Sequence, residues 1–145
     1  MKIYFAGAIR GGRDDAEMYH AIVKQLRNFG EVLTEHVADA ELGVLGQDIG
    51  DRNIHDRDLD WLKAADVLVA EVTIPSLGVG YEIGKASEWK KQILCLYRAS
   101  KGRALSAMIA GCPGAVLCEY QNVAELRGFF AKYLTNENTA SSQQL

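Results

Sequence analysis

Short apolar segments alternate with segments of helical periodicity along the chain, and this alternation is the strongest constraint on its fold. The apolar segments, which predict β-strands, are Lys2–Ala6, Glu31–Val37, Val67–Val72, Gln92–Tyr97 and Ala115–Cys118. Helical periodicity is found at 14–29, 51–65, 79–90, 105–110 and 122–134. Strands that alternate with helices form parallel sheets through right-handed crossovers. We therefore predict an α/β fold: a doubly wound five-stranded parallel sheet, Rossmann-like, with the flavodoxin-like strand order 2-1-3-4-5.

The chain has the size of one domain. It contains 145 residues, of which 48% are hydrophobic and 24% are charged, so residues 1–134 are expected to build a single core. Residues 135–145 contain no aromatic side chain, and we expect this segment to be a disordered tail. Ligands of such folds bind at the carboxyl ends of the strands, where the strand order switches. The turns after the first and third predicted strands are therefore the expected site.

Charge and cysteine content exclude several classes of function. Sixteen Lys and Arg residues against nineteen Asp and Glu residues give a formal charge of -3, without the basic footprint of a protein that binds nucleic acid polymers. No apolar run approaches the roughly eighteen residues of a membrane span. Three cysteines without a CxxC pair and three histidines without HExxH spacing indicate neither disulfides nor a metal site. We expect a cytoplasmic protein, and the nucleus stays open as a second location.

Two acidic residues fall on the apolar faces of predicted helices. At about 100° per residue, Asp58 lies within the apolar stripe of the helix at 51–65, and Glu82 lies within that of the helix at 79–90. Each position also has an explanation without catalysis. Asp58 could form a salt bridge, and Glu82 lies near a predicted helix N-terminus, where the helix dipole favours a negative charge. Because both helices bring their first halves to the same sheet edge, the two acids are expected to face one crevice. Paired carboxylates are typical of enzymes that cleave glycosidic bonds.

Glycine-rich turns follow the first and third predicted strands. The segment Gly7–Arg13 offers backbone N–H groups and two guanidinium groups to an anion, and Ser76–Gly80 opens a helix N-terminus that can hold a phosphate. Neither is a G-x-G-x-x-G fingerprint or a Walker loop, so a dinucleotide site and a P-loop are not indicated. The two turns together favour a nucleotide, and His36 near the end of the second strand is placed to reach the same crevice.

Four segments carry a resemblance to a known family: Tyr4–Arg13, Leu33–Val37, Pro75–Glu82 and Leu105–Ile109. With them the chain resembles the nucleoside 2-deoxyribosyltransferase family, and within it the 2'-deoxynucleoside 5'-phosphate N-hydrolases, from the second residue to about residue 134. The resemblance implies hydrolysis of the N-glycosidic bond of a 2'-deoxynucleoside 5'-monophosphate, which gives free base and 2-deoxyribose 5-phosphate. It implies no cofactor and no metal.

The resemblance also implies roles for particular residues. Glu82 is the expected nucleophile, Asp58 helps to protonate the leaving base or orients the reacting groups, and Tyr4 lies close to the nucleophile. By its pattern alone Ser106 is an ordinary surface residue, but the resemblance places it at the phosphate of the neighbouring subunit in a homodimer. The expected substrate-binding residues are Gly7, Ile9, Arg10, Gly11, Arg13, His36, Ser76, Gly78, Ser106 and Met108.

The chain departs from the family at Ala8, where the mammalian enzymes carry a serine; the departure leaves the nucleophile in place. Two other functions stay open. One is a transferase that passes the deoxyribosyl group to another base, and the other is a nucleotide-binding module without catalysis. The hydrolase requires the 5'-phosphate of its substrate, whereas the transferase prefers nucleosides without it. A binding module differs from both because it releases no base. The sequence also leaves open which base is preferred, and whether the substrate is a modified nucleotide such as 5-hydroxymethyl-dUMP.

Overall fold

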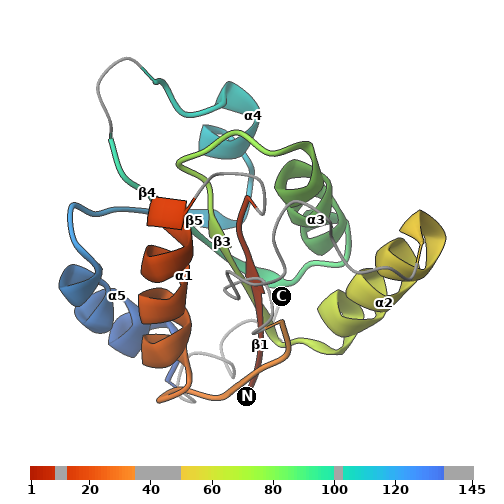
Figure 1. The fold of residues 1–145 in the computed structure, drawn as a ribbon, viewed down its shortest axis with the longest axis horizontal. Helices are drawn as coiled ribbons and strands as arrows, with labels where there is room; N and C mark the ends of the chain where they lie inside the picture. Colours follow the sequence, from red (N-terminus) through yellow and green to blue (C-terminus); the bar gives the residue numbers. More distant parts are fainter. Residues whose placement is uncertain (9–12, 35–49, 100–102, 136–145) are drawn as a thin grey trace.

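The sheet has the predicted topology. The computed structural model describes residues 1–8, 13–34, 50–99 and 103–135, so nearly all of the predicted tail lies outside it. Within the described residues five parallel strands pair in the order β2-β1-β3-β4-β5, which confirms the predicted order (Figure 1). The strands are β1 (Lys2–Ala6), β2 (Glu31–Val32), β3 (Val67–Glu71), β4 (Gln92–Tyr97) and β5 (Ala115–Glu119).

Helices cover both faces of the sheet, as a doubly wound fold requires. Their bounds are α1 (Arg13–Leu26), α2 (Asp51–Ala64), α3 (Leu77–Glu88), α4 (Ala107–Ala110) and α5 (Leu126–Tyr133), with the 3-10 turn η3 (Val123–Glu125) before α5. Helices α1 and α5 lie on one face, whereas α2 and α3 lie on the other (Figure 1). Since β1 and β3 are neighbours, the turns that follow them meet at the carboxyl edge of the sheet.

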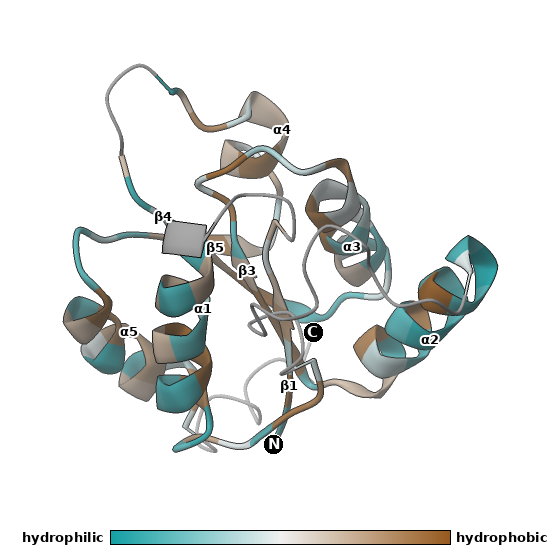
Figure 2. Ribbon diagram, viewed as in Figure 1, coloured by the Kyte–Doolittle hydropathy of each residue, from teal (hydrophilic) through white to brown (hydrophobic). Residues whose placement is uncertain are grey.

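Successive residues of each strand point to opposite faces and build two apolar layers. On β1, Ile3 and Phe5 pack with α1 and α5, whereas Tyr4 and Ala6 pack on the face of α2 and α3. Figure 2 shows the strands mainly in the brown of apolar residues, with teal residues on the surrounding helices. Among the described helices, none combines the length and apolar character that a membrane crossing needs. The strand register thus puts Tyr4 on the same face as the helices that carry Asp58 and Glu82.

The second strand is shorter than the predicted Glu31–Val37, because it ends at Val32. Two residues later the buried hydroxyl of Thr34 accepts a hydrogen bond from the Phe5 N–H at 2.8 Å and donates one to the Phe5 carbonyl at 2.6 Å. A side chain therefore takes the place of the next backbone pair, and the ladder stops there. The rest of the predicted strand, from residue 35, lies outside the described residues.

Three helices differ from prediction at their starts. Helix α3 begins at Leu77, two residues early, because the Ser76 hydroxyl accepts from the Val79 N–H at 3.3 Å and caps the first turn. Helix α4 begins two residues late, at Ala107, directly after Ser106. The helix predicted at 122–134 consists of η3 followed by α5. These shifts move no predicted site residue to another face of the fold.

The buried face of α1 is wider than the predicted stripe. Of that stripe, Ile22 and Leu26 are fully buried, while Met18 and Phe29 are partly buried. Tyr19 lies on the same face with only 3% of its surface exposed. A large aromatic side chain therefore stands between α1 and the end of β1.

Gly30 ends the α1 region for a steric reason. Its N–H donates to the Leu26 carbonyl at 3.2 Å. A Cβ at this position would lie 2.3 Å from the Met1 carbonyl oxygen, so a larger residue would collide with the backbone before β1. The glycine that the sequence marks as a helix stop is thus required by a close approach of two backbone segments.

Candidate active site

A cavity of about 210 Å³ opens between the first halves of α2 and α3, at the carboxyl edge of the sheet. Both predicted acids line it, together with Gly78 from the first turn of α3. The cavity thus lies beside the turn after β3, where the strand order predicts a ligand. Its lining residues are Asp51, Ile54, His55, Asp58, Leu59, Gly78, Tyr81 and Glu82.

The three residues with predicted catalytic roles meet in this region. Tyr4 is buried on β1, and its hydroxyl forms a hydrogen bond with the Glu82 carboxyl group. Burial, followed by the negative charges of Glu82 and Asp58, raises the pKa of Tyr4 well above its usual value. Tyr4 therefore stays a neutral hydroxyl that donates to the glutamate. Strand β1, helix α2 and helix α3 each contribute one member of the group.

The protonation of Glu82 differs from the sequence-based expectation. The helix N-terminus was expected to hold this carboxylate ionised. Instead, burial and then the charge of Asp58 raise the pKa of Glu82 from 4.5 to about 7, while the hydrogen bond from Tyr4 acts in the opposite direction. Near neutral pH the free protein holds a mixture of the acid and the carboxylate. Because α3 begins at Leu77, Glu82 lies beyond its first turn, where the helix dipole no longer favours the carboxylate.

The Asp58 side chain points into the cavity, as predicted. It also forms the salt bridge that was expected as the structural alternative to a catalytic role. Its side chain is 21% exposed, against 50% for Asp56 on the outer face of α2. The Arg57 guanidinium donates to Asp58 Oδ1 from Nε at 2.9 Å and from Nη2 at 2.7 Å. The guanidinium also lies 4.7 Å from the centroid of the Trp61 ring. Asp58 is thus oriented by its neighbour while it lines the cavity.

The remaining predicted residues lie in several different places. Ser76 and Gly78 lie at the N-terminus of α3, where backbone N–H groups can meet an anion. Ser106 and Met108 are exposed on and before α4, outside the cavity lining. Gly7 packs against the Tyr19 ring. Of the others, Arg13 is described only as the start of α1, and Ile9, Arg10, Gly11 and His36 lie outside the described residues.

One pair at the cavity was missed from the sequence. His55 is about half exposed. Its Nε2 lies 2.9 Å from the Tyr81 hydroxyl and its Nδ1 lies 2.8 Å from Asp56 Oδ1. The contact joins α2 to α3 beside Asp58 and Glu82. Nothing in the helical pattern marks this pair, because both residues lie on solvent-facing positions of their own helices.

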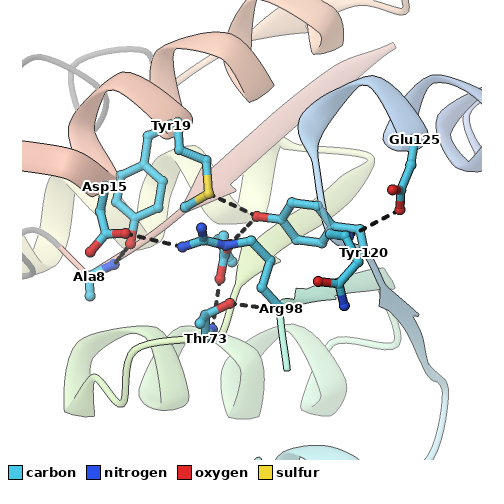
Figure 3. Close-up of polar contacts among 10 residues, drawn as sticks. Ala8, Asp15, Tyr19, Thr73, Arg98, Tyr120 and Glu125 are labelled. Atoms are coloured by element: carbon cyan, nitrogen blue, oxygen red, sulfur yellow. Dashed lines mark hydrogen bonds and ion pairs between the residues drawn. The ribbon is translucent and has the colours of Figure 1, made fainter. Parts of the chain in front are cut away.

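A buried polar cluster on the opposite face was also missed. Glu71, at the end of β3, is 1% exposed and accepts hydrogen bonds from the Tyr120 hydroxyl and, at 2.7 Å, from the Thr73 N–H. The Arg98 Nε lies 3.8 Å from the same carboxylate, and its Nη2 donates to Asp15 Oδ1 at 3.2 Å (Figure 3). A single glutamate within the apolar run of β3 was the available signal, but its partners are distant in sequence.

Comparison with known proteins identifies the family. The family model described as nucleoside 2-deoxyribosyltransferase matches residues 3–124, which is most of the chain. The chain belongs to the nucleoside 2-deoxyribosyltransferase family. All three residues that meet beside the cavity lie within the matched region, and so do both glycine-rich turns.

Curated relatives within the nucleoside 2-deoxyribosyltransferase family are close in sequence. The chain is 64% identical over 113 residues to a protein named 5-hydroxymethyl-dUMP N-hydrolase from Tetraodon nigroviridis, a match that covers 77% of this chain and 80% of that protein. It is 51% identical over 148 residues to the protein of the same name from Rattus norvegicus, which covers 97% of this chain and 91% of the relative.

A solved structure shares the fold. The Clostridium botulinum CMP N-glycosidase BcmB superposes with a TM-score of 0.65 at 20% identity, over 92% of this chain and 100% of that one. Within the parts of the chain that the structure describes, no three His, Cys, Asp or Glu side chains are grouped so that they can hold a metal ion. Beside the cavity the described residues offer a carboxyl pair, a tyrosine hydroxyl and a helix N-terminus.

Proposed function

We propose that this chain hydrolyses the N-glycosidic bond of 2'-deoxynucleoside 5'-monophosphates, releasing free base and 2-deoxyribose 5-phosphate. The observation that carries the proposal is the meeting of Tyr4, Asp58 and Glu82 beside one cavity at the carboxyl edge of the sheet. The names of the curated relatives support the same reaction, and 5-hydroxymethyl-dUMP is the first substrate to test.

In the proposed reaction Glu82 is the nucleophile. Its carboxylate attacks C1' of the deoxyribose, a C–O bond forms, and the C1'–N bond breaks with its electron pair moving to the base. Asp58, or solvent that it orients, supplies the proton that the base takes up. Water then attacks C1' of the glycosyl ester, the bond from C1' to Glu82 breaks to restore the carboxylate, and the proton that the water loses replaces the one given to the base. The transition state has oxocarbenium character, which a sugar without the electron-withdrawing 2'-hydroxyl reaches more easily.

Tyr4 is proposed to control the nucleophile. Its hydroxyl donates to the Glu82 carboxylate, which favours the charged form, whereas burial and Asp58 oppose that form. With a pKa of about 7 the carboxyl group is ionised in part of the molecules at neutral pH and can attack as an anion. Loss of the Tyr4 hydroxyl would move this balance toward the protonated, non-nucleophilic acid.

The 5'-phosphate is proposed to bind at the N-terminus of α3. The Ser76 hydroxyl and the backbone around Gly78 stand there, and a helix N-terminus favours an anion. Because Gly78 also lines the cavity, a phosphate at this end would place the sugar near the two carboxyl groups. The segment after β1 is proposed to contribute Gly7 and, from the sequence pattern, residues 9–11 and 13. His36 is proposed to complete the nucleotide site.

The experiment is a chromatographic assay of free base. The substrates are 5-hydroxymethyl-dUMP, dGMP, GMP and deoxyguanosine, each tested with and without added free adenine. A hydrolase of deoxynucleoside monophosphates releases base from one or both deoxynucleotides, leaves GMP and deoxyguanosine intact, and forms no dAMP. Formation of dAMP from a deoxynucleotide, or of deoxyadenosine from deoxyguanosine, would identify a transferase instead. Binding of the deoxynucleotides in calorimetry without release of any base would identify a binding module.

We further infer a homodimer in which Ser106, with Met108 near it, completes the partner's site. In support, the Ser106 side chain makes no capping hydrogen bond to α4, Met108 is 82% exposed, and Leu77 at the start of α3 is 97% exposed. Two apolar side chains this exposed are typical of a surface that is covered in an assembly.

Mixing two inactive variants tests the shared site. A dimer that combines Glu82→Ala with Ser106→Ala holds one intact site if the serine acts across the interface, so a re-equilibrated mixture should regain roughly a quarter of wild-type activity. Recovery of no activity from such mixed dimers would refute the shared site.

The three cysteines form no disulfide, which supports a reducing compartment. We infer a cytoplasmic location, and cell fractionation tests whether the protein also enters the nucleus.

A further inference from the structure

We propose that Tyr19 of α1 is a positioning residue that holds the backbone of Gly7 and Ala8, at the end of β1, in place for nucleotide binding. This inference rests on the proposed function, since Gly7 is taken as part of the nucleotide site. Tyr19 lies on the face of the sheet opposite Tyr4 and Glu82, so it does not itself approach the reacting carboxyl groups. Its contacts are with the backbone that enters the turn.

The first contact is a buried hydrogen bond. The N–H of Ala8, the second residue after β1, donates to the Tyr19 hydroxyl oxygen at 3.1 Å (Figure 3). Ala8 is 7% exposed and Tyr19 is 3% exposed, so water cannot readily replace this partner. Burial and nearby carboxylates raise the pKa of Tyr19 above its usual value, so it remains a neutral hydroxyl.

The second contact is steric. A Cβ built at Gly7 would lie 2.9 Å from both Cε2 and Cζ of the Tyr19 ring, closer than real side chains come. The ring therefore packs directly on the backbone of Gly7, and the position requires glycine because of this neighbour. Tyr19 thus sets both the path of the chain at Gly7 and the direction of the next N–H group.

Tyr19 is itself held in place. Its ring meets Phe5 edge to face, with centroids 5.6 Å apart and planes at 69°. Phe5 in turn has both backbone groups bonded to the Thr34 hydroxyl. The anchor therefore belongs to the rigid core around β1 and β2. A residue held in this way keeps the backbone of Gly7 and Ala8 in a fixed position relative to the sheet.

The start of α1 is also held against the sheet. Asp15, in the first turn of α1, accepts from Arg98 Nη2 at 3.2 Å, and Arg98 Nε lies 3.8 Å from Oε2 of the buried Glu71 carboxylate (Figure 3). Tyr120, directly after β5, donates to the same carboxylate oxygen at the end of β3. The helix that carries Tyr19 is thus fixed relative to the sheet near its first turn.

Holding Gly7 and Ala8 in place before the ligand arrives reduces the ordering that binding requires. The expected consequence of losing one anchor is weaker ground-state binding, with the chemistry at Glu82 left unchanged. Replacing Tyr19 by phenylalanine keeps the ring and removes only the hydroxyl. It therefore separates the hydrogen bond from the packing.

The test compares Tyr19→Phe with wild type and with Tyr97→Phe, whose hydroxyl donates to the exposed Arg103 carbonyl at 2.8 Å. Melting temperature, KM and kcat for base release, and Kd for dGMP are measured for each. We expect Tyr19→Phe to raise KM and Kd about three- to tenfold, as for one buried hydrogen bond, with kcat changed less than about twofold. Tyr97→Phe should leave all four values close to wild type.

A lower melting temperature for Tyr19→Phe with unchanged KM and Kd would overturn the proposal, because the residue would then be structural only. A fall in kcat alone would overturn it as well. If wild type binds dGMP but releases no base from any nucleotide, the proposed hydrolase fails, whereas the Kd comparison still decides the role of Tyr19. The double variant gives a second criterion: Gly7→Ala should weaken binding in wild type and add little once Tyr19→Leu has removed the ring.

Discussion

Replacing Glu82 by glutamine should remove a pH dependence of folding stability. In the folded chain the Glu82 pKa is raised from 4.5 to about 7, because burial and the charge of Asp58 disfavour the carboxylate. Between these two values the folded state binds more protons than the unfolded state, so the free energy of unfolding falls as the pH rises. One pKa unit corresponds to about 1.4 kcal/mol, so Glu82 should cost the wild type about 3 kcal/mol between pH 4.5 and pH 8.

Urea unfolding followed by circular dichroism at several pH values between these limits measures the effect. Glutamine has the size of glutamate but does not titrate, so the stability difference between Glu82→Gln and wild type should move in favour of the variant by about 3 kcal/mol as the pH rises. The control is Glu88→Gln on the same helix, whose side chain is 66% exposed and pairs with Lys85. This control measures what the same substitution does at an exposed position of the helix.

A difference between Glu82→Gln and wild type that stays constant within about 0.5 kcal/mol across this range would refute the reasoning. It would mean that Glu82 is neither desolvated nor close to a second carboxylate in solution. The pairing of Glu82 with Asp58 would then be lost as the basis for the proposed chemistry. A change of the opposite sign would carry the same conclusion, since it requires a lowered pKa in the folded state.

Three further outcomes are expected. Asp58→Asn removes a charge that raises the Glu82 pKa, so the acidic limb of the pH–rate profile should move to lower pH, and an unmoved limb would contradict the coupling. Tyr120→Phe leaves the buried Glu71 without its hydroxyl donor and should lower the free energy of unfolding by about 1–3 kcal/mol in urea denaturation; no loss would show that the bond is not formed. Thr34→Val removes two hydrogen bonds to the β1 backbone and should cost a similar ~1–3 kcal/mol, which the same assay measures.

The fold could be predicted from the sequence because its determinants are local and repetitive. Apolar runs separated by helical patterns lead to a parallel sheet, and the fixed hand of the crossovers leaves few strand orders. The inward direction of Asp58 and Glu82 follows from helical geometry alone. Strand β2 was predicted too long, because the Thr34 hydroxyl replaces backbone pairing, and no periodic pattern reveals such a substitution.

The properties of the site that depend on distance in space were not predictable. The raised pKa of Glu82 arises from a charge on another helix and from burial, neither of which a helical wheel contains. Glu71 is visible in the sequence as one charge in an apolar strand, but its partner Tyr120 lies 49 residues away. The packing of Tyr19 on Gly7 is likewise a contact between elements. Residue types and periodicity therefore predict which acids point inward, and the structure adds what each one meets.

In the proposed reaction Glu82 carries out base release at the cavity between α2 and α3. Its role is measured by the initial rate of free base formation from 5-hydroxymethyl-dUMP by wild type, Glu82→Ala and the control Glu88→Ala, at equal concentrations of folded protein. Wild type and the Glu88 variant should release the base, whereas Glu82→Ala should lose at least about a thousandfold in rate, as for a missing nucleophile. Release by Glu82→Ala at a rate close to wild type would contradict this role of Glu82.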